Sequence, residues 1–423
     1  MKTLRFTIYD LRFVICCLLF TLASAQLYAQ SNPRSVMVKN DEGIDEEIML
    51  PESMTADIDS LYLDWVAKNH IDWNQECVET ESSRTLSDSI FIERLERLPA
   101  VIEMPYNQIV REFIDQYLTT KRKNAAFMLS ANNFYMPIFE EALDMYSLPL
   151  ELKYLPAIES GLNPSATSNQ GASGLWQFTL STAKVYGLKV TSLVDERRDP
   201  VKSTRAAVRY LKDLYDIYND WNLVLAAYNC GPGTVNKAIR RAGGETDFWA
   251  IYNYLPAQTR GYVPGFIAVN YIMNYYCEHG IAPMSMTLPA VTDTVEISRS
   301  LNLNQVAKVC DISIEQLRSL NPEYKRDIIP GNEMPYPLRL PADKVSTFIE
   351  LEESVYEYKV AGTTQRRATV QAGKDGKEEW YMVKNGDTLG GIASKYGVSV
   401  RQIQELNGLQ GTNIRAGKSL RIR

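Results

Sequence analysis

A glutamate near the end of an apolar helical segment is the residue in this sequence best placed for acid–base chemistry. Glu159 directly follows Ile158, which lies with Leu155 on the expected buried face, and it comes just before Gly161, a residue that ends helices. The negative end of the helix dipole and apolar surroundings both disfavour the ionised carboxylate. A glutamate whose pKa is raised in this way can act as a general acid at neutral pH. The simplest alternative is a surface glutamate at a helix end.

Three later segments supply amide and aromatic side chains that could hold a substrate beside this acid. A glycine-rich loop closes on the sequence Gly-Leu-Trp-Gln, which ends at Gln177. The sequence Ala-Ala-Tyr-Asn then contributes Tyr228 and Asn229, and Thr-Arg-Gly-Tyr ends at Tyr262. Aromatic rings and amides in this combination are suited to sugars, which offer apolar ring faces and hydroxyl groups.

Together, the four segments resemble the four motifs of the lytic transglycosylases of glycoside hydrolase family 23, whose fold is a lysozyme-like helical domain. The domain order of the chain resembles the D type of membrane-bound lytic murein transglycosylases. The resemblance implies that Glu159 is the single catalytic acid/base and that five residues bind substrate: Ser160, Gln177, Tyr228, Asn229 and Tyr262. Ser160 would orient the glutamate or the N-acetyl group of the sugar. Cys230 stands where the family usually has alanine, and a small buried cysteine should be tolerated there.

The resemblance also implies a substrate and a reaction. Members of the family cleave the β-1,4 bond between N-acetylmuramic acid and N-acetylglucosamine in peptidoglycan and leave 1,6-anhydromuramoyl ends, with no enzymatic nucleophile. Residues 160–176 contain no Asp or Glu, which agrees with a single catalytic carboxylate. Two alternatives remain open: a muramidase, which would use water and release reducing ends, and a peptidoglycan-binding protein without activity.

Helical periodicity dominates the region around these motifs. Ile109, Phe113 and Tyr117 form one apolar stripe, and Asp199-Pro200 is typical of a helix start because the acid caps the helix and proline fits its first turn. No alternating strand pattern of useful length interrupts residues 106–276. We therefore predict a mainly α fold, and the resemblance implies a lysozyme-like catalytic domain at residues 106–283.

The C-terminal part contains two similar stretches. Leu303, Ala307 and Leu320 recur as Leu389, Ala393 and Leu406. Each copy reads as strand–helix–helix–strand and resembles the LysM module, which binds N-acetylglucosamine-containing glycan. We predict a degenerate LysM-like module at residues 290–345, a linker at 346–378 and a LysM domain at 379–423.

In the second copy, the resemblance implies that six residues bind glycan: Gly386, Asp387, Thr388, Leu389, Asn413 and Ile414. The first copy has Asn302-Leu303 in place of the Gly-Asp-Thr-Leu opening, so it is expected to be structural. The paired helices of the second copy also resemble a DNA-reading helix-turn-helix, and basic residues outnumber acidic ones there. The flanking strands and the exported location argue against this alternative, and no nucleic acid is expected as a partner.

The amino terminus indicates export. Basic residues precede an apolar run of signal-peptide length, and Ala23-Ser24-Ala25 resembles a cleavage site, so residues 1–25 are predicted to be a signal peptide. Cleavage after Ala29, lipidation at Cys16 or Cys17 and an uncleaved anchor remain alternatives, and the last two would attach the protein to the membrane. We expect the mature protein in the periplasm or cell envelope. Residues 26–105 have no assigned role, and residues 30–55 are expected to be poorly ordered because they are polar and acidic.

Composition excludes several classes of protein. The 423 residues are 45% hydrophobic and 23% charged, which is typical of globular domains rather than disordered chains. The chain contains two histidines, so a site that needs three is excluded, and we expect neither a metal nor a cofactor. The formal net charge is −6, and the six cysteines are too few to indicate a disulfide scaffold or a pairing. We expect a monomer whose partner is the peptidoglycan glycan strand.

Overall fold

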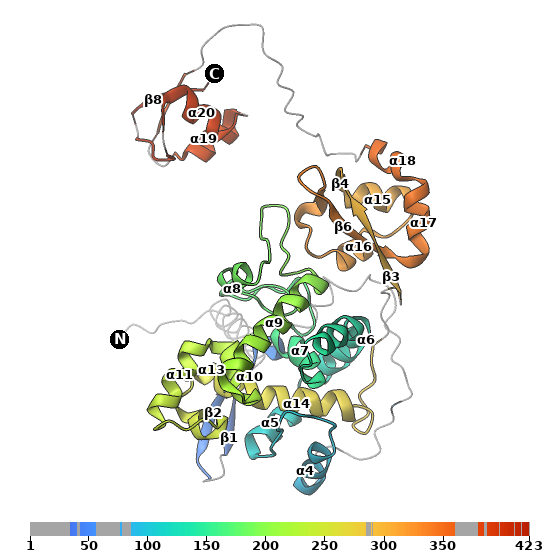
Figure 1. Ribbon diagram of the computed structural model, residues 1–423, viewed down its shortest axis with the longest axis vertical. Coiled ribbons are helices and arrows are strands. Elements are labelled where there is room, and N and C mark those ends of the chain that lie inside the picture. Colours follow the sequence, from blue (N-terminus) through green and yellow to red (C-terminus); the bar gives the residue numbers. More distant parts are fainter. Residues whose placement is uncertain are drawn as a thin grey trace, which may run out of the picture. The chain divides into compact units, whose positions relative to one another are not determined.

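The computed structural model of the chain describes residues 34–39, 43–55, 77, 86–284, 289, 291–359, 380–384, 387–396, 398–409, 411–415 and 417–422. Residues Met1–Lys359 and Val360–Arg423 form two separate units (Figure 1). The predicted signal peptide, its cleavage sites, Cys16 and Cys17 lie outside the described residues, and so does Gly386. Among the described residues, none of the helices combines the length and apolar character needed to cross a membrane.

The catalytic region is helical, as the periodicity predicted (Figure 1). Its α-helices and two short 3-10 helices are α4 (Asp88–Glu96), α5 (Gln108–Leu118), α6 (Arg122–Met145), η2 (Leu150–Tyr154), α7 (Leu155–Ser160), α8 (Leu180–Val185), α9 (Pro200–Tyr218), α10 (Trp221–Cys230), α11 (Pro232–Arg241), α12 (Phe248–Ile251), η3 (Tyr252–Tyr254), α13 (Ala257–Arg260) and α14 (Tyr262–Tyr275). Helix α14 is buried from Tyr262 to Met273, and it packs against α5, α7 and α10. A helix that is apolar on all sides belongs inside a core, and α14 is the helix around which the others assemble.

Local sequence signals explain where several of these helices begin and end. The carboxylate of Asp199 accepts hydrogen bonds from the backbone N–H groups of Val201 (2.9 Å) and Lys202 (3.0 Å), so it caps α9 as predicted. Helix α10 ends at Gly231, whose φ of +82° lies in the region that favours glycine. The predicted apolar stripe of α5 is buried.

Most of residues 34–39 and 43–55 form secondary structure, which corrects the expectation that residues 30–55 are poorly ordered. Strands β1 (Ser35–Lys39) and β2 (Asp45–Met49) form an antiparallel hairpin in which Val36 pairs with Ile48, and helix α2 (Glu52–Thr55) follows. Val36 and Ile48 are buried in the same core as α14, together with Met54. The acidic composition concealed the apolar residues Val36, Val38 and Ile48, which are buried, whereas Asp45 and Glu47 are exposed.

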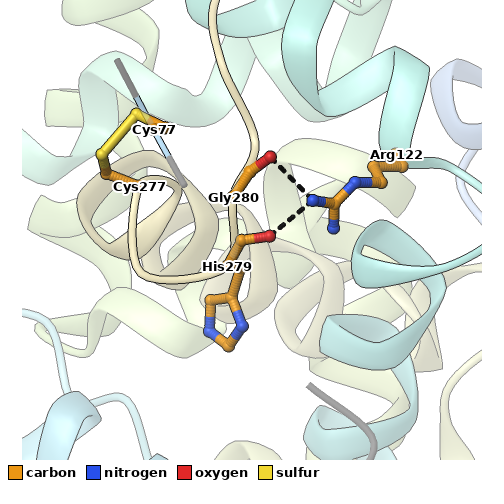
Figure 2. Close-up of a disulfide and its surroundings, with 5 residues drawn as sticks. All are labelled: Cys77, Arg122, Cys277, His279 and Gly280. Atoms are coloured by element: carbon orange, nitrogen blue, oxygen red, sulfur yellow. Dashed lines mark hydrogen bonds between the residues drawn. A yellow bond between two sulfur atoms is a disulfide. The ribbon is translucent and has the colours of Figure 1, made fainter. Parts of the chain in front are cut away.

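A disulfide attaches a further part of the N-terminal region to the catalytic helices. Cys77 and Cys277 are bonded, with their Cα atoms 4.9 Å apart (Figure 2). The guanidinium of Arg122 donates to the backbone oxygens of His279 (2.6 Å) and Gly280 (2.7 Å), so the chain just after Cys277 is also held (Figure 2). The sequence left this pairing open because it contains no signal for contacts between residues so far apart.

The first LysM-like module has a core of its own. Its elements are β3 (Thr292–Ile297), β4 (Ser300–Asn302), α15 (Leu303–Val309), α16 (Ile314–Leu320), η4 (Lys325–Asp327), β5 (Ile328–Pro330), β6 (Tyr336–Pro341), α17 (Ala342–Glu350) and α18 (Glu352–Glu357). Strand β3 pairs with β6, and β4 with β5, both antiparallel. Helices α17 and α18 occupy the start of the range where we expected a linker, because Phe348 and Val355 are buried in the core of the module.

The second module consists of β7 (Trp380–Met382), α19 (Leu389–Tyr396), α20 (Val400–Asn407) and β8 (Ser419–Arg421), with β7 antiparallel to β8. This is the predicted strand–helix–helix–strand order. One asparagine has the same bonds in both copies. Asn321 accepts from the N–H of Arg339 and donates to its C=O, and Asn407 does the same with Arg421. The internal repeat seen in the sequence is therefore also a repeat of hydrogen bonds.

Candidate active site

The site is built around the end of helix α7, which carries Glu159. Pro156 lies in the first turn of α7, where a missing N–H costs nothing, and Gly161 ends the helix with a φ of +61°. The side chain of Glu159 lines a cavity of about 140 Å³. Gln177, Tyr228, Asn229 and Tyr262 line the same cavity, so the structure brings together five of the residues that were identified from separate motifs.

The electrostatic setting of Glu159 favours its protonated form. Burial raises the pKa of Glu159 from 4.5 to about 7, and the negative charge of Glu52 contributes in the same direction. The hydroxyl of Tyr262 donates a hydrogen bond to Oε1 of Glu159 and offsets part of this rise. The carboxyl group therefore exchanges its proton near neutral pH, which is the property required of an acid that must later act as a base.

The two tyrosines of the cavity are held in place by different partners. The hydroxyl of Tyr262 is directed at Glu159, whereas the hydroxyl of Tyr228 donates to the backbone oxygen of Trp176 (2.8 Å). Burial raises the pKa values of both tyrosines well above the ordinary value, so both remain neutral hydrogen-bond donors over the physiological range. Tyr262 is thus the group that stabilises whatever negative charge develops on Glu159.

The two amide side chains are fixed by their own hydrogen bonds. Oδ1 of Asn229 accepts from the hydroxyl of Thr259 (2.8 Å), and Nε2 of Gln177 donates to the backbone oxygen of Gly174 (2.8 Å). Gln177 has a φ of +45°, a backbone conformation that residues other than glycine rarely adopt. The loop that carries Gln177 therefore has a specific geometry, and it also lines the cavity with Ser168, Gln170 and Ala172.

Ser160 lies outside the cavity lining, which differs from the expectation that it contacts substrate or Glu159. Its side chain is buried, and its hydroxyl lies 3.0 Å from both the backbone oxygen of Leu175 and that of Pro156. Because an O–H next to two carbonyl oxygens can only donate, Ser160 ties α7 to the loop before Gln177. Its position makes it a brace between two motifs.

One wall of the cavity comes from the N-terminal segment, which sequence reasoning missed. Pro51 and Glu52 line the cavity, and the neighbouring Ser53 donates a hydrogen bond to the backbone oxygen of Ile158. At the other side of the segment, Arg260 forms an ion pair with Glu46 (2.6 Å). The sequence signal was the alternation of apolar residues in the hairpin. This alternation indicates that one face of the hairpin is buried, but it does not predict which part of the protein covers that face.

The predicted glycan-binding residues of the second module have mixed roles. Asp387 accepts hydrogen bonds from the backbone N–H of Lys384 (2.8 Å) and the hydroxyl of Tyr381 (2.9 Å), and these bonds lower its pKa. The hydroxyl of Thr388 accepts from the N–H of Gly391 (3.1 Å) at the start of α19.

The remaining members of that set divide between the core and the surface. Leu389 is buried and Ile414 packs against the same core, so both support the module, whereas Asn413 is exposed. Exposure alone makes Asn413 available to a glycan. Among the described residues of the whole chain, no group of three or more histidine, cysteine or acidic side chains could hold a metal ion.

Comparison with known proteins supports the resemblance drawn from the motifs. Three family models match: a Transglycosylase SLT domain at residues 136–250, the LysM-like domain of lytic transglycosylase MltD at 291–357, and a LysM domain at 381–423. Membrane-bound lytic murein transglycosylase D of Escherichia coli (strain K12) is 33% identical over 323 residues, which cover 75% of this chain and 70% of the relative.

Other relatives match a smaller part of the chain. Membrane-bound lytic murein transglycosylase F of Yersinia enterocolitica is 32% identical over 170 residues, which cover 34% of each protein. The crystal structure of the 70 kDa soluble lytic transglycosylase of Escherichia coli is 27% identical over 33% of this chain and 24% of that chain, with a TM-score of 0.30. Since the D-type relative is covered over more than two thirds of its length, the chain belongs to the lytic murein transglycosylases of the D type.

Proposed function

We propose that the protein cleaves the β-1,4 bond between N-acetylmuramic acid and N-acetylglucosamine in peptidoglycan and leaves 1,6-anhydromuramoyl ends, with Glu159 as the single acid and base. The observation that carries this proposal is the position of Glu159. Its carboxyl group lines a cavity with Tyr228, Asn229 and Gln177, and it accepts a hydrogen bond from Tyr262. Burial raises its pKa to about 7, so a proton is available where a sugar can reach it.

In the first step, Glu159 donates its proton to the glycosidic oxygen, and the bond between that oxygen and C1 of the muramic acid breaks. The N-acetyl group of the substrate stabilises the positive charge that develops at C1. The Glu159 carboxylate is stabilised by the Tyr262 hydroxyl during this step, since a hydrogen bond to a charged group is stronger than one to a neutral group.

In the second step, Glu159 takes the proton of the C6 hydroxyl of the same sugar, and the oxygen of that hydroxyl bonds to C1. The product is an internal ether, Glu159 regains its proton, and no water is consumed. A pKa of about 7 suits both steps, because a group that donates and then accepts a proton works best when its pKa is near the ambient pH.

The alternative reaction is hydrolysis, for which one observation supplies a candidate base. Glu52 lines the same cavity as Glu159, so the site contains a second carboxylate, as hydrolases that use water require. Glu52 is exposed, and in the proposed reaction its charge acts on Glu159 without taking part in proton transfer.

The experiment that tests the reaction is digestion of purified sacculi followed by mass spectrometry of the released glycans. We expect anhydromuramic acid ends, which are lighter than reducing ends by one water. The Glu52→Gln variant should still form anhydro ends, and the Glu159→Gln variant should form no product. Reducing ends that disappear in Glu52→Gln would instead establish the muramidase, and equal release by wild type and Glu159→Gln would establish the inactive binding protein.

We further propose that the second LysM module holds glycan and that the protein acts in the cell envelope after export through its N-terminal signal. A weakly binding module that is joined to the catalytic unit raises the local concentration of the cavity over its substrate. Membrane attachment would follow if the N-terminus is retained or lipidated, and a monomer suffices because one chain supplies every residue of the cavity.

A further inference from the structure

The first LysM-like module is joined to the catalytic region by a continuous strip of hydrogen bonds. The backbone N–H of Lys325 donates to the oxygen of Leu193 (2.7 Å), and the N–H of Asp195 donates to the oxygen of Glu323 (2.9 Å). Between these bonds, Val194 is buried in the core of the module itself. A side chain of one region that completes the core of another is a feature of a permanent interface rather than of a passing contact.

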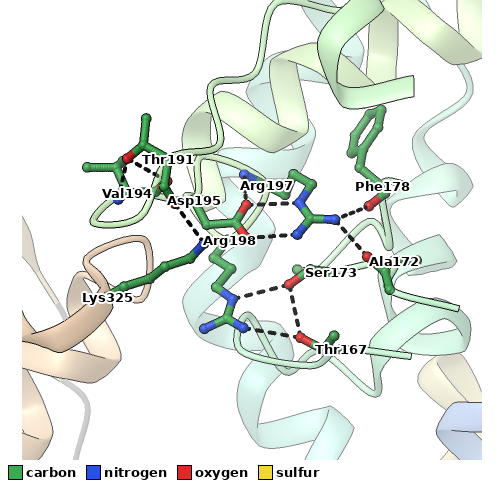
Figure 3. A network of polar contacts seen from close by, with 12 residues as sticks. Thr167, Ala172, Ser173, Phe178, Thr191, Val194, Asp195, Arg197, Arg198 and Lys325 are labelled. Carbon is green, nitrogen blue, oxygen red and sulfur yellow. Dashed lines mark hydrogen bonds and ion pairs between the residues drawn. The ribbon is translucent and has the colours of Figure 1, made fainter. Parts of the chain in front are cut away.

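Asp195, which belongs to this strip, also forms a buried ion pair with Arg197 in the catalytic region. The guanidinium of Arg197 donates to both carboxylate oxygens of Asp195, at 2.9 and 2.8 Å, and both side chains are buried (Figure 3). Lys325 of the module lies 3.7 Å from the same carboxylate and donates to the backbone oxygen of Thr191 (3.0 Å). Burial acts to raise the pKa of Asp195, but Arg197 and Lys325 hold it below its ordinary value. The pair therefore remains charged and rigid.

The other end of Arg197 holds the loop that carries Gln177. Its second amino group donates to the backbone oxygens of Gly171 (2.8 Å) and Phe178 (3.0 Å) (Figure 3). A Cβ atom at Gly174 would lie 1.8 Å from the backbone oxygen of Arg197, so the loop also packs directly on the arginine backbone. We call residues 163–178 the cleft loop.

A second arginine repeats this support. The guanidinium of Arg198 donates to the hydroxyls of Ser173 and Thr167, both at 3.1 Å (Figure 3). The cleft loop supplies Ser168, Gln170 and Gln177 to the lining of the cavity, whereas Arg197 and Arg198 do not touch the cavity. The two arginines consequently act on the site through the loop that they hold.

We propose that the first LysM-like module is a positioning element for the substrate-binding wall of the active site, acting through Asp195 and Arg197 on the cleft loop. The module fixes Val194 and Asp195, and Asp195 orients the guanidinium of Arg197. Arg197 then holds the cleft loop at Gly171, between Gln170 and Ala172, and at Phe178, next to Gln177. A wall that is ordered before the sugar arrives loses less entropy on binding. This role rests on the proposed function. It would explain why the first module is present although it lacks the Gly-Asp-Thr-Leu opening found in the second module.

The test compares Lys325→Ala, at the first residue of η4, with Arg318→Ala, on helix α16. Lys325→Ala removes the contacts to Asp195 and Thr191, whereas Arg318→Ala removes an ion pair to Asp327 that lies inside the module. Val194→Asp places a charge in the core of the module and disrupts the strip more severely. The full-length enzyme is assayed on a soluble tetrasaccharide of alternating N-acetylglucosamine and N-acetylmuramic acid, and hydrogen exchange is measured over residues 166–178.

We expect KM to rise about threefold in Lys325→Ala and about tenfold in Val194→Asp, with kcat within about twofold of wild type. The pH at which kcat declines should stay unchanged, because Glu159 is not part of the cleft loop. Exchange over the cleft loop should increase in both variants and remain as in wild type in Arg318→Ala.

Two results would overturn the proposal. One is an unchanged KM and unchanged exchange of the cleft loop in Lys325→Ala, which also decides the matter if Val194→Asp does not fold. The other is faster exchange at residues 193–195 and 323–325 without any change in the cleft loop. An inactive wild type would refute the proposed reaction instead, and the exchange measurement would still report on the connection between module and loop.

Discussion

Two glutamates with raised pKa values lie in different regions of the molecule. Glu159 lies at the catalytic cavity with a pKa of about 7, and Glu323 lies where the first LysM-like module meets the catalytic region, with a pKa of about 8. Burial is the largest cause in both cases. Their neighbours differ: Glu159 accepts a hydrogen bond from Tyr262, whereas neither carboxyl oxygen of Glu323 has a hydrogen-bond partner among the described residues.

The difference shows that a raised pKa does not by itself identify a catalytic acid. At Glu323 the nearby charge of Asp199 adds to burial in raising the pKa, and Arg339 offsets only part of the effect. Glu323 is buried, however, and it is not among the residues that line the cavity. Glu159 combines the perturbed pKa with access to a substrate and with a donor that stabilises its anion, and on this combination we propose it as the catalytic group.

The largest expected effect is on activity, and it separates the two glutamates directly. Glu159→Gln removes the exchangeable proton and should lower kcat on sacculi by about a thousandfold or more. Glu323→Gln keeps the shape of the neutral carboxyl group and should leave kcat and KM within about twofold of wild type. The measurement is the release of soluble glycan over time, with circular dichroism to show that both variants are folded. A large loss of kcat in a folded Glu323→Gln would mean that the second glutamate is functional after all.

The next largest effect concerns the hydrogen bond from Tyr262 to Glu159, which has no counterpart at Glu323. Tyr262→Phe removes the donor to Glu159 and should lower kcat by about 10- to 100-fold, the range expected for a hydrogen bond to a charged group. Tyr275→Phe is a matched control on the same helix, because its hydroxyl donates to the backbone oxygen of Arg94 away from the cavity. If both variants lose activity equally, general destabilisation of α14 explains the effect rather than the loss of anion stabilisation.

The sequence was sufficient to predict the cavity residues that belong to contiguous motifs. The glycine after Glu159 left a surface glutamate as the alternative, and the resemblance of its segment to a motif of the family is what singled it out. Gln177, Tyr228, Asn229 and Tyr262 were identified in the same way, each from a short segment that resembles a family motif. The helix boundaries at Asp199 and Gly231 were predictable from the local sequence, since caps depend on neighbours in the chain.

The remainder depends on contacts between residues that are distant in the chain. Glu52 reaches the cavity because the hairpin before it packs on α5 and α13 and its own helix α2 packs on α7, whereas composition suggested disorder for that segment. Ser160 was assigned to substrate because a sequence cannot show which way a side chain points at a helix end. Glu323 carries no local signal, since its raised pKa arises from burial and from the charge of Asp199, which is distant in the chain.

The pH dependence of kcat should distinguish the neighbours of Glu159. Because the protonated acid is required, kcat should be flat at low pH and fall about tenfold per unit above about pH 7. Glu52→Gln removes a charge that raises the pKa of Glu159, so the decline should begin at lower pH. Tyr262→Phe removes a bond that lowers this pKa, so its decline should begin at higher pH.

A control variant for the charge effect is Asp45→Asn, because Asp45 is exposed and paired with Lys39 away from the cavity. Its pH profile of kcat should match that of wild type. Shifts of Glu52→Gln and Tyr262→Phe in the same direction would show that Glu159 is not the group being titrated.

The smallest expected effect is on stability, where Glu323 is the informative residue. Below about pH 4.5 its carboxyl group is protonated in both the folded and the unfolded chain, so it has no pH-dependent effect. Between that value and about pH 8 the unfolded chain ionises more readily than the folded one, so folding stability falls as the pH rises.

Glu323→Gln removes this loss and should raise Tm by about 2–4 °C at pH 8, with little change at pH 4.5. Glu333→Gln, an exposed residue of the same module, is the matched control and should show no such difference between the two pH values in scanning calorimetry. A Tm gain in Glu323→Gln that is the same at both pH values would show that Glu323 is ionised in the folded protein, and the contrast with Glu159 would then lose its basis.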